Sequence, residues 1–324
     1  MRRFAITCAV IIVVSFIFQP LAFAEPSPTR PDQTSSATIA KPESTWSAAR
    51  MAAATSFDSI KPGTRSGRGA EPDAPANPGK IEPRLPTNAP QGIAPLANAT
   101  PTTGKLFLHN PNTGSDGYCT ASAINSGNLS QIITAAHCVH TGPNGCNDNP
   151  GSAAWMTEAE FAPLYWSGDR PYGTFQVRTL RTFDTWIADC DWDYDIAIVT
   201  TYTNENNQLL VETVGGNGIS YNYPGSFDSV TFGYPGNRDG GEIPWTCEGT
   251  TNYGFPDYRP TLYCAWTGGF SGGPWFREYS NDTLLGYVNG VGSTWPGPDD
   301  GPEWIDSPYF DDKVQSIYDD AAGD

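Results

Sequence analysis

A serine bracketed by glycines stands in the segment Thr267-Gly-Gly-Phe-Ser-Gly-Gly-Pro-Trp275. Glycines on both sides allow a tight turn whose backbone N–H groups point outward, and such donors can bind the oxyanion that forms when a serine attacks a carbonyl carbon. A serine hydroxyl is a weak nucleophile at neutral pH and needs a neighbouring base, most often a histidine. The chain has three histidines, His109, His137 and His140, and all of them precede Ser271.

The order of these residues along the chain limits the possible folds. The letters Gly269-x-Ser271-x-Gly273 also fit the nucleophile elbow of an α/β-hydrolase, but in that fold the catalytic histidine follows the serine. The subtilisin order needs an aspartate before the histidine, and no aspartate ahead of His137 stands in a comparable motif. The order that remains is histidine, then aspartate, then serine.

The candidate base is His137 in the motif Thr134-Ala-Ala-His-Cys138, which follows Gln131-Ile-Ile, a short run with two apolar residues. This pattern predicts a strand that ends just before the histidine, so the ring would be held rigidly and would still reach a cleft. We expect His137 to accept the proton of Ser271 during attack and to return it to the leaving group. His140 is interpreted as an ordinary loop residue.

The candidate acid lies in a cluster of four aspartates between residues 189 and 195. Asp195 directly precedes the apolar run Ile196-Ala-Ile-Val199, which predicts a carboxylate at the start of a buried strand. Asp193 is the second candidate. We expect Asp195 to accept the second ring N–H of His137 and to hold its tautomer, while the N–H groups of Gly269 and Ser271 bind the oxyanion.

The first part of the chain has a different character from the rest. Residues 1–24 have the pattern of a secretory signal peptide, with Arg2 and Arg3, an apolar run, and small residues at Ala22 and Ala24. The run is shorter than the roughly 20 residues of a spanning helix, so we expect export and not a membrane anchor. Residues 25–104 are rich in Pro, Ala, Ser and Thr and are predicted to be a propeptide or a disordered linker.

Cysteine use agrees with an oxidising compartment. The chain has seven cysteines; Cys8 lies in the predicted signal, and six remain, enough for three disulfides with fifteen possible pairings. A zinc site is the competing use of cysteine, but no Cys-x-x-Cys pair occurs and the histidines complete no ligand set. We therefore expect no metal and no other cofactor.

Charge narrows the possible partners. Residues 105–324 hold 28 acidic and eight basic residues, a net charge of −20. Nucleic acids and anionic membranes bind basic surfaces, so we expect neither partner once the signal is removed. No oligomerisation signal stands out, and we expect a monomer.

The elements that must position these residues are predominantly strands. From residue 105 onward, short apolar and aromatic runs alternate with Gly, Pro, Asn and Asp, which is typical of an all-β domain. About 220 residues suit one large or two small barrels. A helix is predicted only at the C-terminus, with Ser307 as its cap, Pro308 in the first turn, and an apolar stripe formed by Phe310, Val314, Ile317 and Tyr318.

Three motifs together resemble the catalytic motifs of trypsin/chymotrypsin-like serine peptidases: Thr134-Ala-Ala-His-Cys138, Asp195-Ile-Ala-Ile198 and Gly269-Phe-Ser-Gly-Gly-Pro274. The resemblance covers about residues 104–324 and implies two six-stranded antiparallel β-barrels with the active site between them. The first barrel would span residues 105–205 and carry the histidine and aspartate. The second, residues 206–324, would carry the serine and end in the C-terminal helix.

The resemblance also implies a disulfide pattern. Cys119 and Cys138 resemble the pair that fixes the loop of the catalytic histidine, and Cys247 and Cys264 resemble a pair of the second barrel. Cys146 and Cys190 are then left as the third pair.

Departures from the family bear on specificity. Phe270 precedes the nucleophile where trypsin-type enzymes carry the aspartate of their activation switch, and motifs such as Gly233-Tyr-Pro-Gly236 are similar to the bacterial glutamyl-endopeptidase-like branch. Where glutamate-specific members of that branch have Thr and His, alignment places Trp266 and Val288. A glutamate side chain would be left unpaired there, so we expect cleavage after small or apolar residues.

The strand expected to pair with the substrate backbone carries the remaining predicted pocket residues: Val288, Asn289, Gly290 and Val291. The sequence as a whole predicts a secreted serine endopeptidase that acts on polypeptides through an acyl-enzyme. Two alternatives stay open: a catalytically silent binding protein on the same scaffold, and a secreted esterase that uses the same triad.

Overall fold

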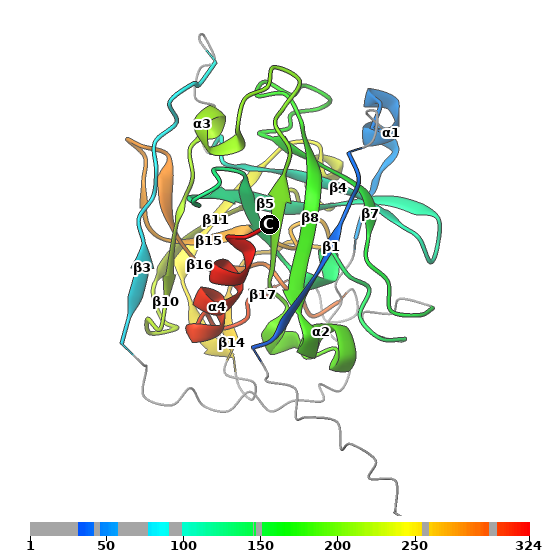
Figure 1. Ribbon diagram of the computed structural model, residues 1–324. Helices are drawn as coiled ribbons and strands as arrows, with labels where there is room; N and C mark the ends of the chain where they lie inside the picture. The colour runs from blue at the N-terminus through cyan, green and yellow to red at the C-terminus, as the bar shows by residue number, and fades with distance from the viewer. Residues whose placement is uncertain are drawn as a thin grey trace, which may run out of the picture. The chain divides into compact units, whose positions relative to one another are not determined.

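The computed structural model describes residues 32–41, 46–57, 77–90, 99–144, 146, 151–254, 259–297 and 303–324, and β-strand is their dominant regular structure (Figure 1). The predicted signal peptide, residues 1–24, lies outside the described residues. Among the described residues, no helix is both long and apolar enough to span a membrane.

Six antiparallel strands of the first half close into a barrel in the order β8-β7-β4-β5-β6-β9, with β9 pairing back to β8. Their bounds are β4 Thr103–Asn110, β5 Ser115–Ile124, β6 Gln131–Thr134, β7 Thr157–Pro163, β8 Phe175–Phe183 and β9 Ala197–Thr201. On β4 the strand period of two sends Leu106 and Leu108 into the barrel core, while Phe107 joins an aromatic cluster on the outside. Both faces of β4 are therefore buried.

The second half contains a six-stranded and a three-stranded sheet. The larger sheet has the order β12-β11-β15-β16-β10-β3, and its bounds are β3 Gly79–Ile81, β10 Gly218–Tyr221, β11 Asp228–Gly233, β12 Trp245–Thr250, β15 Pro274–Ser280 and β16 Leu285–Val291. The smaller sheet consists of β13 Asn252–Gly254, β14 Arg259–Leu262 and β17 Ile305–Asp306. The predicted all-β, chymotrypsin-like fold is confirmed, although β10 and β16 pair in parallel and the strand pairing of the described residues closes only the first barrel.

The C-terminal helix α4 spans Asp312–Ala321 and packs against strands of both halves, β9 and β8 of the first and β10 of the second. Its cap is Asp311, whose side chain accepts a hydrogen bond from the N–H of Lys313, so the predicted cap at Ser307 is wrong. Ser307 is buried and binds the sheet instead, where its Oγ accepts from the N–H of Val291.

The apolar stripe predicted for this helix region is confirmed. Phe310, Val314 and Ile317 are buried in a cluster that also contains Ile198 of the first half and Phe276 of the second, and Tyr318 packs at its edge.

The shorter helical segments are α1 Ala48–Ala53, α2 Asp184–Asp189, α3 Leu210–Val214, η1 Ala136–Cys138, η3 Trp192–Tyr194 and η4 Asp239–Gly241.

Described parts of residues 25–104 belong to the sheets. Strand β1, Thr34–Thr38, pairs with β8; β2, Thr55–Ser56, pairs with β5; and β3 pairs with β10. These parts are therefore not a disordered linker. The composition of these parts did not predict the strands, because the strands contribute mainly backbone hydrogen bonds. Only a few large side chains of this region, such as Trp46 and Met51, are buried. Removal of this region as a propeptide stays a prediction.

Three disulfides join Cys119 to Cys138, Cys146 to Cys190, and Cys247 to Cys264. These are the pairs that the family resemblance implied. The second closes the longest loop, with a sequence separation of 44 against 17 for the third.

We expect the double substitution Cys146→Ser, Cys190→Ser to lower the free energy of unfolding by about 4 kcal/mol, because it releases the longest cross-linked loop in the unfolded chain. The matched control, Cys247→Ser with Cys264→Ser, should lower it by about 3 kcal/mol. Urea unfolding followed by fluorescence measures both. A loss below about 1 kcal/mol for the first pair would contradict the prediction.

Candidate active site

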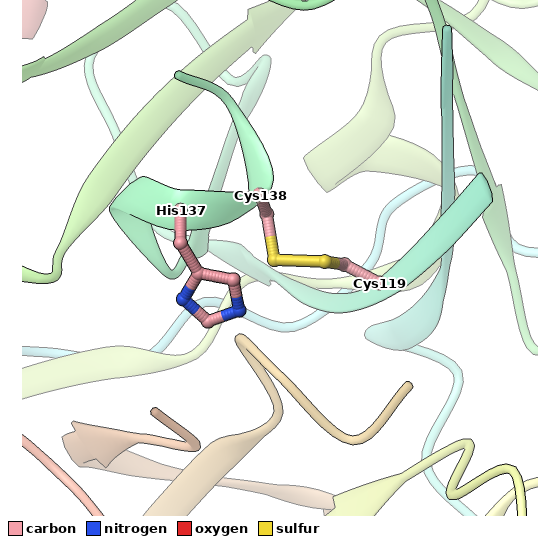
Figure 2. Close-up of side chains that lie close together, drawn as sticks. All are labelled: Cys119, His137 and Cys138. Atoms are coloured by element: carbon pink, nitrogen blue, oxygen red, sulfur yellow. A yellow bond between two sulfur atoms is a disulfide. The ribbon is translucent and has the colours of Figure 1, made fainter. Parts of the chain in front are cut away.

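His137 is held by a short buried element directly after strand β6. The strand ends at Thr134, two small buried alanines follow, and His137 lies in the 3₁₀ helix η1. The next residue, Cys138, is tied by a disulfide to Cys119 of β5, so the histidine loop is fixed to the barrel at both ends (Figure 2). The small side chains leave room for the ring while the barrel sets its position.

Asp195 lies at the start of the neighbouring strand and faces His137. Because β9 pairs with β6 in antiparallel register, with Ala197 opposite Thr134, the start of β9 lies beside the end of β6. Oδ1 of Asp195 accepts from the backbone N–H of His137 at 2.8 Å, and Oδ2 lies 2.9 Å from Nδ1 of the ring. A carboxylate can only accept, so Nδ1 carries the hydrogen and Nε2 is the basic nitrogen.

The Asp195 carboxylate is completely buried, and it remains acidic. Burial alone would raise its pKa, but the neighbouring His137 and the hydrogen bonds from His137 and Ser293 outweigh burial and hold the pKa of Asp195 below its ordinary value. The Ser293 hydroxyl donates to Oδ2 at 2.6 Å. Asp195 is therefore ionised at neutral pH and can stabilise a charged imidazolium on His137.

The turn that carries Ser271 is clamped to the first barrel. Thr120 of β5 donates its N–H to the carbonyl of Ser271 at 2.8 Å and its hydroxyl to the carbonyl of Gly269 at 2.8 Å. Gly269 has φ +94° and Gly272 has φ +79°, conformations that favour glycine. A Cβ on Gly272 would lie 2.0 Å from Oγ1 of Thr134, so the turn packs against the end of β6, three residues before His137.

Two features of this site suit nucleophilic catalysis. Nε2 of His137 is buried and has no hydrogen-bond partner in the described structure. The N–H of Gly269 likewise donates to no backbone acceptor among the described residues. The side chain of Ser271, two residues after Gly269, is itself buried.

Asp193, the second candidate acid, does not take this position. It lies inside the 3₁₀ helix η3, where its N–H is bound by the side chain of Asp191. Asp195 ends the same helix and turns inward.

The predicted pocket residues on strand β16 are buried or bound within the core and the sheet. Val288 and Val291 pack in the cluster between the two halves, and the amide of Asn289 binds the carbonyl of Ser220 and the side chain of Arg277. A Cβ on Gly290 would meet the Ser307 side chain at 2.5 Å. These contacts hold β16 within its sheet, and a part of the four residues in substrate binding stays a prediction.

The segment that does face the site begins one residue after β16. Gly292 exchanges backbone hydrogen bonds with Gly272 and Gly273, and Ser293 reaches Asp195. Sequence reasoning did not assign Ser293, because its contact with Asp195 joins residues 98 positions apart. The signal was present in Gly292-Ser-Thr-Trp295, a polar pair that follows an apolar strand directly.

Aromatic side chains surround the site. Trp266, predicted to line the pocket, is buried with Phe270 and Trp295 in one cluster, and its ring lies 6.4 Å from that of Phe270. The ring centroids of Trp186 and Trp192 lie 6.4 and 6.0 Å from that of His137. The sequence reasoning did not assign these last two residues.

The cysteines beside His137 cannot make the site a zinc centre. The side chains of Cys119, His137 and Cys138 lie close together, but the two sulfurs form a disulfide (Figure 2). Nδ1 of the ring faces Asp195. Zinc binds cysteine as the deprotonated thiolate.

His140, interpreted from the sequence as a loop residue, is buried in a loop. Its ring accepts a hydrogen bond from the N–H of Gly142, and burial lowers its pKa to about 4.

Comparison with known proteins agrees with this geometry. No protein-family model and no curated protein sequence matches the chain. Among solved structures, the chain is similar to protease Anisep from Arthrobacter nicotinovorans, with 29% identity and a TM-score of 0.61 over 75% of this chain and 100% of that one. It is also similar to the thermostable serine protease AL20 from an extremophilic microorganism, with 27% identity and a TM-score of 0.61 over 69% and 98% of the two chains.

A third structure extends the likeness in fold. A Glu endopeptidase in complex with MPD matches with 17% identity and a TM-score of 0.53, over 75% of this chain and 98% of that one. The chain is a trypsin/chymotrypsin-like serine peptidase, related in fold to the glutamyl endopeptidases.

We expect Ser293→Ala to lower kcat for a peptide substrate by about ten- to a hundredfold and to leave KM nearly unchanged. The substitution removes a hydrogen bond to a buried carboxylate, an interaction of about 1.5–3 kcal/mol. Steady-state kinetics measure the effect, and Ser293→Thr, which keeps the hydroxyl, is the control. Equal kcat values for Ser293→Ala and the parent would contradict a positioning role.

Proposed function

We propose that the protein is a secreted serine endopeptidase in which Ser271 is the nucleophile, His137 the general base and Asp195 the partner of the histidine. The observation that carries the proposal is the buried contact of His137 with an ionised Asp195, together with a glycine-bracketed serine whose turn is hydrogen-bonded to the same barrel. A catalytically inactive binding protein would not need the buried charge of Asp195, which is costly to remove from water.

The reaction follows from what each group can do. Nε2 of His137 removes the Ser271 proton as the oxygen attacks the scissile carbonyl carbon, and the N–H groups of Gly269 and Ser271 bind the oxyanion. His137 then donates the proton to the leaving amine, which departs and leaves an acyl group on Ser271. Water, activated by the same nitrogen, attacks the acyl carbon and releases the acid.

Export to an oxidising compartment is part of the proposal. The signal-like pattern of residues 1–24 and three disulfides among the six later cysteines support it. Polypeptide is the substrate class, and the protein acts as a monomer without a metal or other cofactor.

We expect Ser271→Ala to abolish hydrolysis of a denatured protein, and Asp195→Asn to lower kcat by about four orders of magnitude because Asn stabilises the wrong tautomer of His137. Asp193→Asn is the matched control and should retain full activity. Assays on the processed, secreted form measure all three. Parental activity in Asp195→Asn would contradict the assigned acid, and turnover of esters without amides would indicate an esterase.

For specificity we propose small or apolar residues on the acyl side of the cleaved bond. Trp266 is buried in a cluster with Phe270 and Trp295. These aromatic side chains offer few hydrogen bonds to replace the hydration that a substrate carboxylate would lose on binding.

Mass spectrometry of the cleavage products of a denatured protein tests this specificity, and the same experiment gives the mature N-terminus of the secreted form. We expect cleavage mainly after Ala, Val, Leu or similar residues. A profile dominated by Glu, Lys or Arg at the cleaved position would contradict the proposal.

A further inference from the structure

Lys105 of strand β4 is a buried charged residue that has no part in the proton transfers at Ser271. Its side chain is 0% exposed. Nζ donates to Oε1 of Glu242 at 2.9 Å, and it lies 3.8 and 4.6 Å from the ring centres of Tyr118 and Tyr165. Burial lowers the pKa of Lys105, and the hydrogen bond to Glu242 opposes this effect. The side chain therefore places an ammonium group between a carboxylate and two aromatic rings.

Packing alone gives no reason for a charge at this position. An ammonium group loses its hydration on burial, and an apolar side chain of similar size often stabilises a fold as well as a buried ion pair does. Phe107, two residues along the same face of β4, packs in an aromatic cluster of this kind. The contacts of the two nearest partners of Lys105, Tyr118 and Glu242, supply the reason.

The ring of Tyr118 lies against Gly269, the residue whose N–H is the proposed oxyanion donor. A Cβ built on Gly269 would lie 2.7 Å from Cε2 of Tyr118 and 2.5 Å from the carbonyl oxygen of Tyr234. The carbonyl of Gly269 accepts from the hydroxyl of Thr120 at 2.8 Å. The Tyr118 ring, the Tyr234 backbone and the Thr120 hydroxyl thus enclose Gly269 and together set the direction of its N–H.

Glu242 comes from the second half of the chain and holds the other end of the same ring. Its Oε2 accepts from the hydroxyl of Tyr165 at 3.1 Å, while Oε1 accepts from Lys105. The hydroxyl of Tyr118 donates to the carbonyl of Gly240, two residues before Glu242, at 3.4 Å. Lys105 therefore lies over the face of the Tyr118 ring, and its ion pair with Glu242 fixes the turn to which the Tyr118 hydroxyl binds.

We propose that Lys105 and Glu242 are positioning residues for the reaction at Ser271: their ion pair holds the Tyr118 ring against Gly269 and so keeps the Gly269 N–H directed at the oxyanion. The inference rests on the proposed peptidase function and adds to it a buried ion pair that supports the oxyanion donor. A donor of this kind binds the oxyanion more strongly than the ground-state carbonyl. Loss of the ion pair therefore lowers kcat and leaves KM nearly unchanged.

The test compares the parent with Lys105→Met, which keeps an unbranched side chain without the charge. Hydrolysis of a chromogenic peptide gives kcat and KM. A peptide trifluoromethyl ketone reports the oxyanion directly: its carbonyl carbon bonds to the Ser271 oxygen, the serine proton passes to His137, and the carbonyl oxygen becomes an oxyanion.

We expect kcat of Lys105→Met to fall about tenfold at constant KM, less than the hundredfold or more that loss of a whole oxyanion donor costs. The dissociation constant of the ketone should rise by about the same factor, because the ketone and the transition state use the same donor. Parent and variants are compared in the secreted form, after mass spectrometry shows that they have the same N-terminus.

Two further variants separate positioning from general destabilisation. Arg181→Met is the matched control, because it breaks an ion pair with Asp324 elsewhere on the first barrel and should leave kcat and ketone binding unchanged. Glu242→Gln keeps the side-chain size and serves if Lys105→Met fails to fold; we expect kcat about threefold lower, as a partly exposed ion pair implies. The double variant should be no slower than Lys105→Met, because both substitutions act through one contact.

Parental kcat and ketone affinity in Lys105→Met and Glu242→Gln would overturn the inference and leave the peptidase function standing. A fall in kcat that Arg181→Met reproduces, or one without weaker ketone binding, would also overturn it. A folded, processed parent that neither hydrolyses the peptide nor binds the ketone would contradict the peptidase function itself, so the two failures are distinguishable.

Discussion

The buried carboxylate of Asp195 is the constraint on which the arrangement of the site depends. Taking an ion out of water costs several kcal/mol unless its partners replace the lost hydration. The backbone and ring of His137 and the hydroxyl of Ser293 are such partners, one from each half of the chain. The residue after Ser293, Thr294, donates to Asp306, which pairs with buried Arg259. Arg259 in turn donates to the carbonyl of Trp192, three residues before Asp195, so the network returns to the segment from which it began.

This network explains why the site needs two halves and a rigid junction between them. The strands β6 and β9 place His137 and Asp195 side by side, whereas Ser271 and Ser293 come from the second half. Thr120 links the turn at Ser271 to the first barrel, and the apolar cluster around helix α4 joins strands of both halves. Each half alone would lack some of the hydrogen-bond partners of Asp195 and would leave its charge incompletely paired.

The sequence predicted the features that depend on local patterns. A short sequence motif marks each of three features: the strand end before His137, the strand start at Asp195 and the glycine turn at Ser271. The all-β fold follows from short apolar runs that alternate with Gly, Pro, Asn and Asp. The contact of Ser293 with Asp195 could not be predicted, because it depends on the register of β16, and a shift of one residue in a strand turns each side chain to the other face. The ordered structure of residues 46–57 was not predicted, because Arg50 and Trp46 act through contacts with residues more than 60 positions away.

The central claim is that Ser271 is a nucleophile activated by His137. The most direct measurement is reaction of the processed protein with a fluorophosphonate, followed by mass spectrometry of its peptides. The account predicts a single covalent adduct on Ser271 that is lost in His137→Ala, with the fold retained. A folded, processed protein that forms no adduct, or forms it on another residue, would contradict the account.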